Sequence, residues 1–215
     1  MTLGVLGGLG PGATVHFMDR LVEKTPAASD QDHIETLVYN DPTVPDRTDA
    51  ILGDGPSPEE QLVGNAETLD GAGCDAIVID SNTTHHYHEA IESAVAADVP
   101  HLIELVERRL TERGFSSVGV LTTEPAVEMG LYERVADDVV YPERTDLLME
   151  AMYSYKAGEQ DRAADGYRDA VRTVPSPVDG YVVGCTDFSA LPVSLSTPTV
   201  DALDVLVNWC VARYT

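Results

Sequence analysis

Lysine is almost missing from this chain of 215 residues, which contains only Lys24 and Lys156. The 37 acidic and 13 basic residues give a formal net charge of −24, and the acids are spread along the chain. No basic patch exists to neutralise phosphates, so the composition argues against a nucleic-acid-binding protein. A lysine-poor anionic surface is typical of halophilic proteins, because salt screens the repulsion between the acids. The alternative is a merely acidic protein from ordinary conditions.

Long apolar runs are also absent from the sequence. None approaches the roughly 18 residues that a membrane-spanning helix needs, and the N-terminus has no charged region ahead of a long apolar one. We therefore expect no membrane anchor and no signal peptide, and we expect a soluble, cytoplasmic protein. Three cysteines do not make a disulfide framework. Cys74 and Cys210 lie in apolar surroundings and are expected to be inert core thiols.

Two short apolar runs end in small polar or reactive side chains. Residues 76–79 are rich in β-branched side chains, which predicts a buried strand, and Asp80, Ser81 and Asn82 follow. Residues 181–184 repeat the pattern and are followed by Cys185. A thiol at the start of a helix can have its pKa lowered into the reactive range. Two strand ends are therefore expected to present a serine and a cysteine.

The two halves of the chain resemble each other. Residues 2–8 (TLGVLGG) are echoed by residues 117–123 (SVGVLTT), and Ser81 precedes Cys185 by a similar separation. This repetition predicts an α/β fold of two pseudo-symmetric Rossmann-like lobes, each with a mostly parallel sheet flanked by helices. The first lobe is expected to comprise residues 1–99 with 200–215, and the second residues 100–199.

A glycine-rich turn follows the first predicted strand, residues 2–7. Gly8 and Gly10 permit positive φ and close backbone approach, Pro11 suits the first turn of a helix, and exposed N–H groups there would form an anion site. The turn fits a dinucleotide fingerprint only weakly, because no acidic residue is well placed after the second strand. A carboxylate suits it as well as a pyrophosphate.

Two cations are candidates for binding a carboxylate. Residues 33–39 are predicted to form the second strand. The two prolines of the segment that follows predict an extended loop that positions Arg47. A guanidinium matches the two oxygens of a carboxylate, although a solvated surface arginine is the commoner case. Lys156 ends a helical pattern and precedes Gly158, which suits a C-cap. The positive charge of Lys156 would either bind an anionic ligand or stabilise the C-terminal end of its own helix dipole.

The remaining segments complete the expected architecture. Strands are predicted at residues 101–104 and 178–183. Helices are predicted over residues 56–71, from residue 83 to near residue 100, from the end of the strand at 101–104 to residue 114, over 161–171 and over 201–214. His85, His86 and His88 lack a further ligand at a typical spacing, so a metal site is not favoured. One of these histidines is expected to face the pocket, and the other two to be solvated.

Five motifs follow one another in a recognisable order. They are Gly7-Gly8-Leu9-Gly10-Pro11, Pro45-Asp46-Arg47-Thr48, Asn82-Thr83-Thr84-His85, Lys156-Ala157-Gly158 and Gly184-Cys185-Thr186-Asp187. Together they resemble the cofactor-independent aspartate/glutamate racemase family, most closely its aspartate racemase branch, over nearly the whole chain. The resemblance implies a homodimer with the site between two lobes, no pyridoxal phosphate, no metal, and an acidic amino acid as the small-molecule substrate.

The resemblance also implies roles for individual residues. Two thiols would act on opposite faces of the α-carbon, one removing a proton as thiolate and the other returning one, and Cys185 matches one of them. Substrate carboxylates would be held by Arg47 and Lys156, in a cradle completed by Asn82, Thr83, Thr123 and Thr186. The chemistry requires such cations and N–H dipoles, because enediolate charge develops at the substrate.

Ser81, preceded by Asp80, stands where the family has its first catalytic cysteine. A hydroxyl is a far poorer general base than a thiol. Four readings stay open: a natural hydroxyl variant that relays protons through Asp80, His85 or water; one-sided chemistry, as in the related arylmalonate decarboxylases; a chain that has lost catalysis; or an engineered replacement. The leading function is aspartate or glutamate racemisation. The alternatives are a single-thiol decarboxylase or isomerase of a related dicarboxylate, an acidic-amino-acid binding protein and, least favoured, a nucleotide binder.

Overall fold

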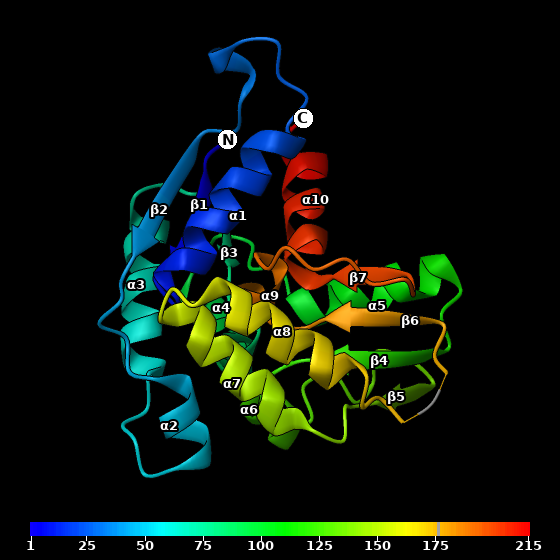
Figure 1. Ribbon diagram of the computed structural model, residues 1–215. Helices are drawn as coiled ribbons and strands as arrows, with labels where there is room; N and C mark the ends of the chain where they lie inside the picture. Colours follow the sequence, from blue (N-terminus) through cyan, green and yellow to red (C-terminus); the bar gives the residue numbers. More distant parts are fainter. Residues whose placement is uncertain (176) are drawn as a thin grey trace. The chain divides into compact units, whose positions relative to one another are not determined.

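The chain forms two compact units in a computed structural model that describes residues 1–175 and 177–215 (Figure 1). The first unit comprises Met1–Leu102 and Leu206–Thr215, and the second comprises Ile103–Val205. Each unit contains one parallel sheet flanked by helices, which confirms the predicted α/β fold class. Within the described ranges, no helix is both long enough and apolar enough to cross a bilayer.

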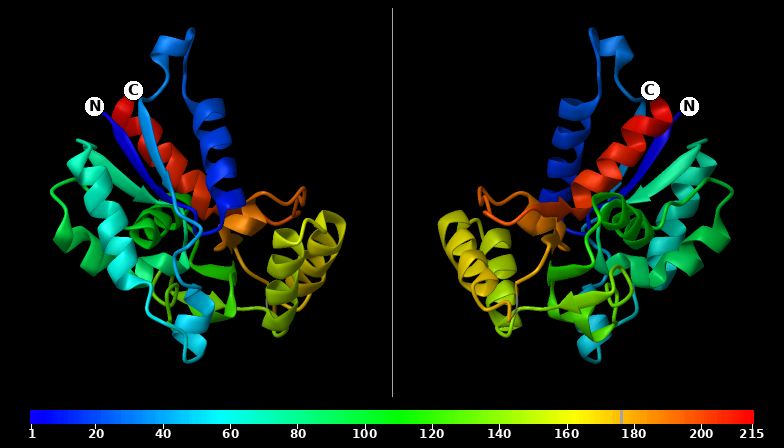
Figure 2. Two further views of the ribbon diagram at one scale, coloured as in Figure 1. Left: turned by 90° about the vertical axis from the view of Figure 1, so that its left-hand side faces the viewer. Right: turned by 90° about the vertical axis from the view of Figure 1, so that its right-hand side faces the viewer.

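The sheet of the first unit has the strand order β2-β1-β3. Its strands are β1 (Leu3–Gly7), β2 (Thr36–Asn40) and β3 (Ala76–Ile79), all parallel. β1 and β3 are apolar throughout and buried along their whole length, as strands covered on both faces must be. β2 lies at the edge of the sheet, with α1 on one side of it and α3 on the other in the left-hand view of Figure 2.

Helices cover both faces of this first sheet. They are α1 (Pro11–Lys24), α2 (Arg47–Leu52), α3 (Glu59–Gly71), α4 (His88–Ala94) and α10 (Ala202–Tyr214), with short 3-10 turns at Asp30–Asp32 and Thr83–Tyr87. α3 contributes Leu62 and Leu69 to a buried cluster with Leu6 of β1 and Ile77 of β3. On the opposite face, Lys24 of α1 donates to the side-chain oxygen of Asn208 of α10 at 3.2 Å. α1 and α10 therefore lie side by side.

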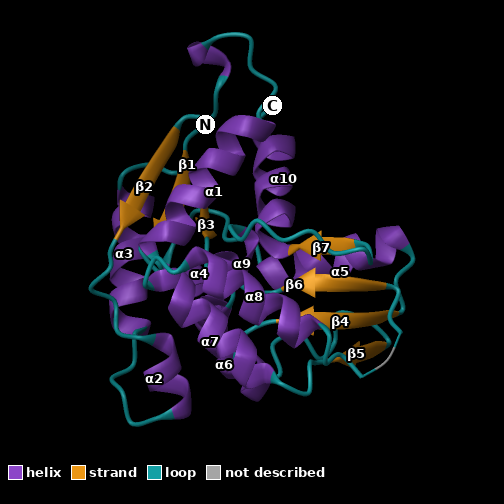
Figure 3. Cartoon of the chain, viewed as in Figure 1, coloured by secondary structure: helices purple, strands orange, loops and turns teal. Residues whose placement is uncertain are grey.

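The sheet of the second unit has the strand order β5-β4-β6-β7, again all parallel (Figure 3). Its strands are β4 (Ser117–Leu121), β5 (Asp138–Val140), β6 (Gly180–Val183) and β7 (Thr199–Asp201). Its helices are α5 (Leu102–Arg113), α6 (Glu124–Glu128), α7 (Thr145–Lys156), α8 (Gln160–Val171) and α9 (Thr186–Ser189). One buried cluster joins α7 and α8 to the ends of β4 and β6.

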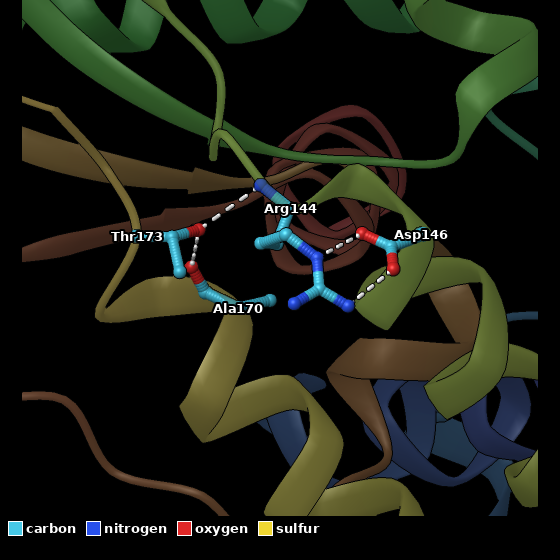
Figure 4. Close-up of polar contacts among 4 residues, drawn as sticks. All are labelled: Arg144, Asp146, Ala170 and Thr173. Atoms are coloured by element: carbon cyan, nitrogen blue, oxygen red, sulfur yellow. Dashed lines mark hydrogen bonds and ion pairs between the residues drawn. The ribbon is translucent and has the colours of Figure 1, made fainter.

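The α7–α8 pair positions Lys156 at its turn. Figure 4 shows the opposite end of the pair, where the N–H of Arg144 donates to the hydroxyl of Thr173, which donates in turn to the carbonyl of Ala170. At the turn, Gly158 has a φ of +82° and donates to the carbonyl of Tyr155, while Glu159 donates to the carbonyl of Ser154. This pair of hydrogen bonds is a Schellman motif. The predicted C-cap at Gly158 is confirmed.

Several predicted elements differ from the structure. The strand predicted at residues 101–104 is wrong, because α5 begins at Leu102 and buries its apolar side chains along one helical face. The second strand begins at Thr36 and not at residue 33. The segment predicted as one helix from residue 83 to near residue 100 begins as a 3-10 turn, continues as α4 and ends at Ala94. The helix start expected at Cys185 is that of α9, whereas four short elements were not predicted: α2, α6, β5 and β7. All of them have six residues or fewer, too few to show a hydrophobic period.

All three cysteines are free and buried. Burial raises the pKa of Cys74, and it raises the pKa of Cys210 to about 12. Both thiols therefore stay protonated near neutral pH, which confirms the expectation that they are core side chains.

Candidate active site

The residues of the predicted site follow the carboxyl ends of parallel strands. In the first unit, Gly8 follows β1, Arg47 lies in the segment after β2, and Ser81 follows β3. In the second unit, Thr123 follows β4 and Cys185 follows β6. Carboxyl ends of parallel strands share one edge of a sheet, where ligands bind in open α/β folds. Each unit thus gathers its own set of candidate residues at one edge.

Gly8 permits a close approach of two backbone segments. Its φ is +86°, and a Cβ added to it would lie 2.3 Å from the backbone nitrogen of Asp41. Its own N–H donates to the hydroxyl of Thr14 at 2.9 Å. Gly8 therefore adopts the positive φ that the sequence predicted. Its N–H, however, is already hydrogen-bonded within the protein to Thr14.

Arg47 is the first residue of α2, not a loop residue as predicted. Asp46 caps this helix by accepting from the N–H groups of Thr48 and Asp49. The guanidinium of Arg47 donates to the carbonyl oxygen of Pro45 at 3.2 Å and to that of Leu9. Arg47 thereby ties the turn after β1 to the segment after β2, which holds its charge at the carboxyl edge of the sheet.

Asp41 supports this edge and was not singled out from the sequence. Its carboxylate accepts from the hydroxyl of Thr43 at 2.7 Å, from the amide of Gln61 at 2.8 Å and from the amide of Asn65 at 2.9 Å. These donors hold the pKa of Asp41 well below its usual range. Its position directly after a strand, before a proline, was the available signal.

Ser81 lies in a buried polar cluster at the end of β3. Its hydroxyl is hydrogen-bonded to the hydroxyl of Thr84 at 2.9 Å, and its carbonyl lies 2.9 Å from Nδ1 of His85. Asp80 and Asn82 beside it are buried, and Thr83 is half-buried. The carboxylate of Asp80 faces Gly7, since a Cβ there would lie 3.2 Å from its Oδ2. These four consecutive residues therefore form a polar segment directly after β3.

Three histidine rings pack together beside Ser81. The ring centroid of His101 lies 5.3 Å from that of His85 and 4.5 Å from that of His88. Because a carbonyl only accepts, the contact of His85 with Ser81 places its proton on Nδ1. The buried Nε2 has no hydrogen-bond partner among the residues that the structure describes. Burial, followed by the neighbouring His101, lowers the pKa of His85 to about 3. The ring is therefore neutral near pH 7.

The other two histidines of the motif divide between the interior and the surface. His86 is exposed, but His88 is buried and its Nε2 lies 2.8 Å from the carbonyl of Val99. The expectation that both would be solvated is wrong for His88, because α4 turns that ring inward. Among the residues that the structure describes, no three His, Cys, Asp or Glu side chains are arranged to hold a metal ion.

Cys185 is the N-cap of α9 and is buried. Burial, followed by the charge of Asp187, raises the pKa of its thiol to about 12. The N–H groups of Asp187 and Phe188 and the charge of Lys156 act in the opposite direction. The helix-end effect inferred from the sequence is thus present, but the prediction of a lowered pKa is wrong because desolvation outweighs it.

An ion pair lies next to this thiol. Nζ of Lys156, at the end of α7, lies 3.9 Å from Oδ2 of Asp187 in α9. The lysine side chain is 37% exposed, whereas that of Asp187 is 9% exposed. Lys156 is therefore a partly accessible cation close enough to Cys185 to affect its pKa. Asp187 belongs to the recognised motif, although no role was assigned to it.

The candidate residues of the second unit lie at the ends of β4 and β6. The hydroxyl of Thr122 donates to the carbonyl of Gly184 at 2.7 Å, and buried Thr123 occupies the N-cap position of α6. A Cβ added to Gly184 would lie 3.0 Å from the ring of Tyr132, which is fully buried. Thr186 is buried at the start of α9. Tyr132 was missed because its position beneath Gly184 depends on tertiary packing.

Comparisons with known proteins agree with the motifs. A family model described as Asp/Glu/Hydantoin racemase matches residues 6–210. The broad specificity amino-acid racemase RacX of Bacillus subtilis (strain 168) is 24% identical over an alignment of 226 positions that covers 99% of this chain and 97% of that protein. The structure of Picrophilus torridus aspartate racemase has a TM-score of 0.91 at 27% identity and covers 99% of this chain and 94% of its own.

More distant structures extend the likeness. Glutamate racemase from Campylobacter jejuni subsp. jejuni has a TM-score of 0.70 at 17% identity and covers 99% of this chain and 86% of its own, which shows a shared fold alone. The family match spans the strand ends of both units and confirms the resemblance carried by the five motifs. The chain therefore belongs to the Asp/Glu/hydantoin racemase family, a family of isomerases.

Proposed function

We propose that this protein is a cytoplasmic homodimer that racemises an acidic amino acid, with aspartate as the first substrate to test, and that it needs neither pyridoxal phosphate nor a metal. The observation that carries the proposal is the buried thiol of Cys185 at the end of β6, with Lys156 and Asp187 beside it. The likeness to an aspartate racemase over 99% of the chain supports the choice of aspartate. RacX, a broad specificity racemase, makes glutamate the next substrate to test.

Two cations would bind the carboxylates of the substrate. Arg47 is held in place by two backbone carbonyls, so its fork is preorganised for a carboxylate. Lys156 is partly exposed, and its 3.9 Å contact with Asp187 is a loose one that a substrate carboxylate can replace. The side chains of Asn82, Thr83, Thr123 and Thr186, with the turn at Gly8, would supply the remaining polar contacts. Such fixed dipoles stabilise enediolate charge without reorganising.

Cys185 would exchange the proton of the α-carbon. As a thiolate, its sulfur takes the α-proton and leaves an enediolate; as a thiol, it returns a proton to the same face of the enediolate. Its raised pKa keeps it a thiol in the substrate-free protein, so it is ready to donate. Removing a proton requires the thiolate, which the nearby charge of Lys156 and the N–H groups at the start of α9 favour.

Ser81 would serve the opposite face as a hydroxyl. Its hydrogen bond to Thr84 fixes the position of its oxygen, and a proton would pass between it and Asp80, His85 or water. The lack of a thiol here also favours a second candidate, a single-thiol decarboxylase or isomerase of a related dicarboxylate, because such chemistry needs a proton donor on one face only. A hydroxyl alone is a weak base.

Solvent-deuterium exchange at the α-carbon distinguishes the two candidates. The experiment follows L-aspartate and D-aspartate separately in high salt. Two-sided racemisation incorporates deuterium from both enantiomers, one-sided chemistry from only one, and a binding protein from neither. Ser81→Cys should raise the racemisation rate and Cys185→Ser should abolish exchange, whereas Cys74→Ser, which removes another buried thiol, should leave exchange in place. An undiminished rate in Cys185→Ser would remove Cys185 from the mechanism.

A further inference from the structure

The second unit contains a partly enclosed cavity of about 280 Å³ beside the segment that joins α9 to β7. Its lining comes from α8, the end of β6, α9, that joining segment and β7, all within the second unit. Cys185, Thr123 and Lys156 do not line it, so it is separate from the candidate active site. Small-molecule sites begin at roughly 300 Å³. The cavity therefore has room for a small ligand only.

Apolar side chains form one part of the cavity wall. They are Val183, Phe188, Leu191, Val193 and Leu195. The ring of Phe188 packs against that of Tyr167, with the two ring centroids 5.1 Å apart. An occupant with an apolar group would lose water-exposed surface against these side chains, which favours its binding.

Asp201 lines the same cavity and has one carboxylate oxygen to spare. Its Oδ1 accepts from the hydroxyl of Ser189 at 2.8 Å and from the N–H of Leu203 at 2.9 Å, at the start of α10. Its Oδ2 has no hydrogen bond or ion pair within the described parts of the chain. Burial raises the pKa of Asp201, because it disfavours a carboxylate that no cation compensates. Oδ2 is therefore the oxygen that a ligand could use.

Tyr167 of α8 offers a second polar group to the cavity. The residue is only 3% exposed, and its hydroxyl has no hydrogen-bond partner among the described residues. Burial, followed by the charge of Asp201, raises the pKa of this hydroxyl, so the hydroxyl lies on the side of the ring that faces Asp201. A buried hydroxyl without a partner costs free energy. One occupant between the two residues would satisfy both of them.

The chemistry of this lining selects an organic cation. An ionised carboxylate only accepts hydrogen bonds, so it favours a charged donor such as an ammonium group. The formal charge of −24 attracts cations to the whole protein. Among the residues that the structure describes, no three His, Cys, Asp or Glu side chains are arranged to hold a metal ion. An inorganic cation would also make no use of the apolar wall.

We propose that this cavity binds a small primary amine in its ammonium form, with an aliphatic or aromatic group attached to it. The ammonium group donates to Oδ2 of Asp201 and to the hydroxyl oxygen of Tyr167, and the apolar group packs against Phe188 and Leu195. The site goes beyond the proposed racemisation and does not depend on it, because its lining includes neither Cys185 nor the two substrate-binding cations.

Isothermal titration calorimetry of the full chain with benzylamine tests the site. An alkylamine is protonated at pH 7.5, and about 1 M NaCl screens weak attraction to the acidic surface. Benzylamine should bind at one site per chain. Benzyl alcohol has the same shape without the charge, and it should bind at least about tenfold more weakly. Equal affinities for the two compounds, or no saturable binding of benzylamine, would overturn the proposal and leave a cavity filled by water.

Removing the charge of Asp201 tests the role of the carboxylate. In Asp201→Asn the amide oxygen still accepts from Ser189 and from the start of α10, so the helix cap is kept. The dissociation constant for benzylamine should rise at least about tenfold. Asp165→Asn is the matched control, because it removes a carboxylate of α8 whose side chain is 77% exposed, and it should leave the affinity unchanged.

Two further positions test the cavity without changing its charge. Tyr167→Phe removes only the hydroxyl and should raise the dissociation constant about three- to tenfold. Leu195→Phe fills the cavity and should abolish binding, whereas Leu195→Ile keeps the volume and should preserve it. Circular dichroism checks each fold, and if Asp201→Asn unfolds, the Leu195 pair decides together with the comparison of amine and alcohol. Unchanged affinity for benzylamine in Leu195→Phe would place its binding elsewhere and overturn the assignment.

Discussion

At the scale of single residues, the proposed proton transfer depends on the electrostatics of Cys185. The thiol begins a helix, and the N–H groups of that helix favour its thiolate. Burial and the carboxylate of Asp187 oppose them and raise its pKa to about 12. At pH 7 a pKa near 12 leaves about one thiolate in 10⁵ molecules. Substrate binding must therefore shift this balance when Cys185 acts as the base.

Replacing Asp187 should make the thiol easier to ionise. In Asp187→Asn the repelling charge disappears and Lys156 loses the carboxylate that pairs with it, so both changes favour the Cys185 thiolate. We expect the midpoint of the pH dependence of iodoacetamide alkylation to fall by about one unit. Mass spectrometry of the peptide that contains Cys185 separates it from the other two thiols. Asp187→Glu keeps the charge and should react as slowly as the wild type; an unchanged midpoint in Asp187→Asn would contradict this account.

His85 should make folding stability depend on pH. The pKa of His85 falls from 6.5 to about 3 on folding. As the pH is lowered, the unfolded chain therefore takes up a proton on this ring at a higher pH than the folded chain does. The stabilisation is fully present above pH 6.5 and is lost as the pH falls toward 3. Over this window the free energy of unfolding should fall by at most about 1.4 kcal/mol per pH unit from this residue. Urea titrations at several pH values measure the slope.

A matched pair of variants isolates this contribution. His85→Asn removes the titrating ring, while its amide still donates toward the carbonyl of Ser81, so its slope below pH 6.5 should be shallower than that of the wild type. His86→Asn changes an exposed neighbour and should leave the slope unaltered. Equal slopes in all three proteins would mean that protonation of His85 does not oppose folding.

At the scale of elements, long or strongly apolar segments were predictable and short ones were not. The strands at residues 2–7 and 76–79 have continuous β-branched or aliphatic patterns that reveal burial, and Gly158 marked a helix end. Residues 101–104 were misjudged because a short apolar run fits a strand and the first turn of an amphipathic helix equally well. The apolar runs at residues 76–79 and 181–184 correctly predicted that Ser81 and Cys185 follow the ends of strands.

What the sequence could not reveal was how tertiary packing changes local chemistry. The turn motifs located Cys185, but its raised pKa comes from burial, which no local pattern reports. The inward turn of His88 and the position of Tyr132 beneath Gly184 depend in the same way on contacts between distant segments. The three-ring contact of His85, His88 and His101 was likewise invisible, because His101 belongs to a separate part of the chain.

The turn after β1 should tolerate no side chain at Gly8. Gly8 and Gly73 have φ values of +86° and +88°, so an alanine at either position should lose about 1–2 kcal/mol from the left-handed backbone. At Gly8 the added Cβ would also lie 2.3 Å from the nitrogen of Asp41, whereas at Gly73 nothing lies within 4 Å. The clash should cost about 1–3 kcal/mol more. Urea denaturation of Gly8→Ala and Gly73→Ala compares them, and equal losses would contradict the close approach.

At the scale of the whole molecule, the charge of −24 dominates. Lysine and arginine are too few to pair with the acids, and the surface ion pairs of neighbours such as Arg109 and Glu112 contribute little because both partners are solvated. Repulsion between unpaired acids therefore opposes the compact state, and dissolved salt is what relieves it. We therefore propose that this chain is adapted to a salty environment.

Salt should therefore stabilise this protein strongly at neutral pH. Raising NaCl from about 0.01 M to 1 M shortens the Debye length from roughly 30 Å to 3 Å, which removes most of the repulsion between surface acids. We expect the midpoint of thermal unfolding to rise by at least about 5 °C, which for a chain of this size corresponds to roughly 2 kcal/mol. Near pH 4.2, the isoelectric point of the sequence, the same salt series should have a much smaller effect. A midpoint that is insensitive to salt at pH 7 would contradict a halophilic adaptation.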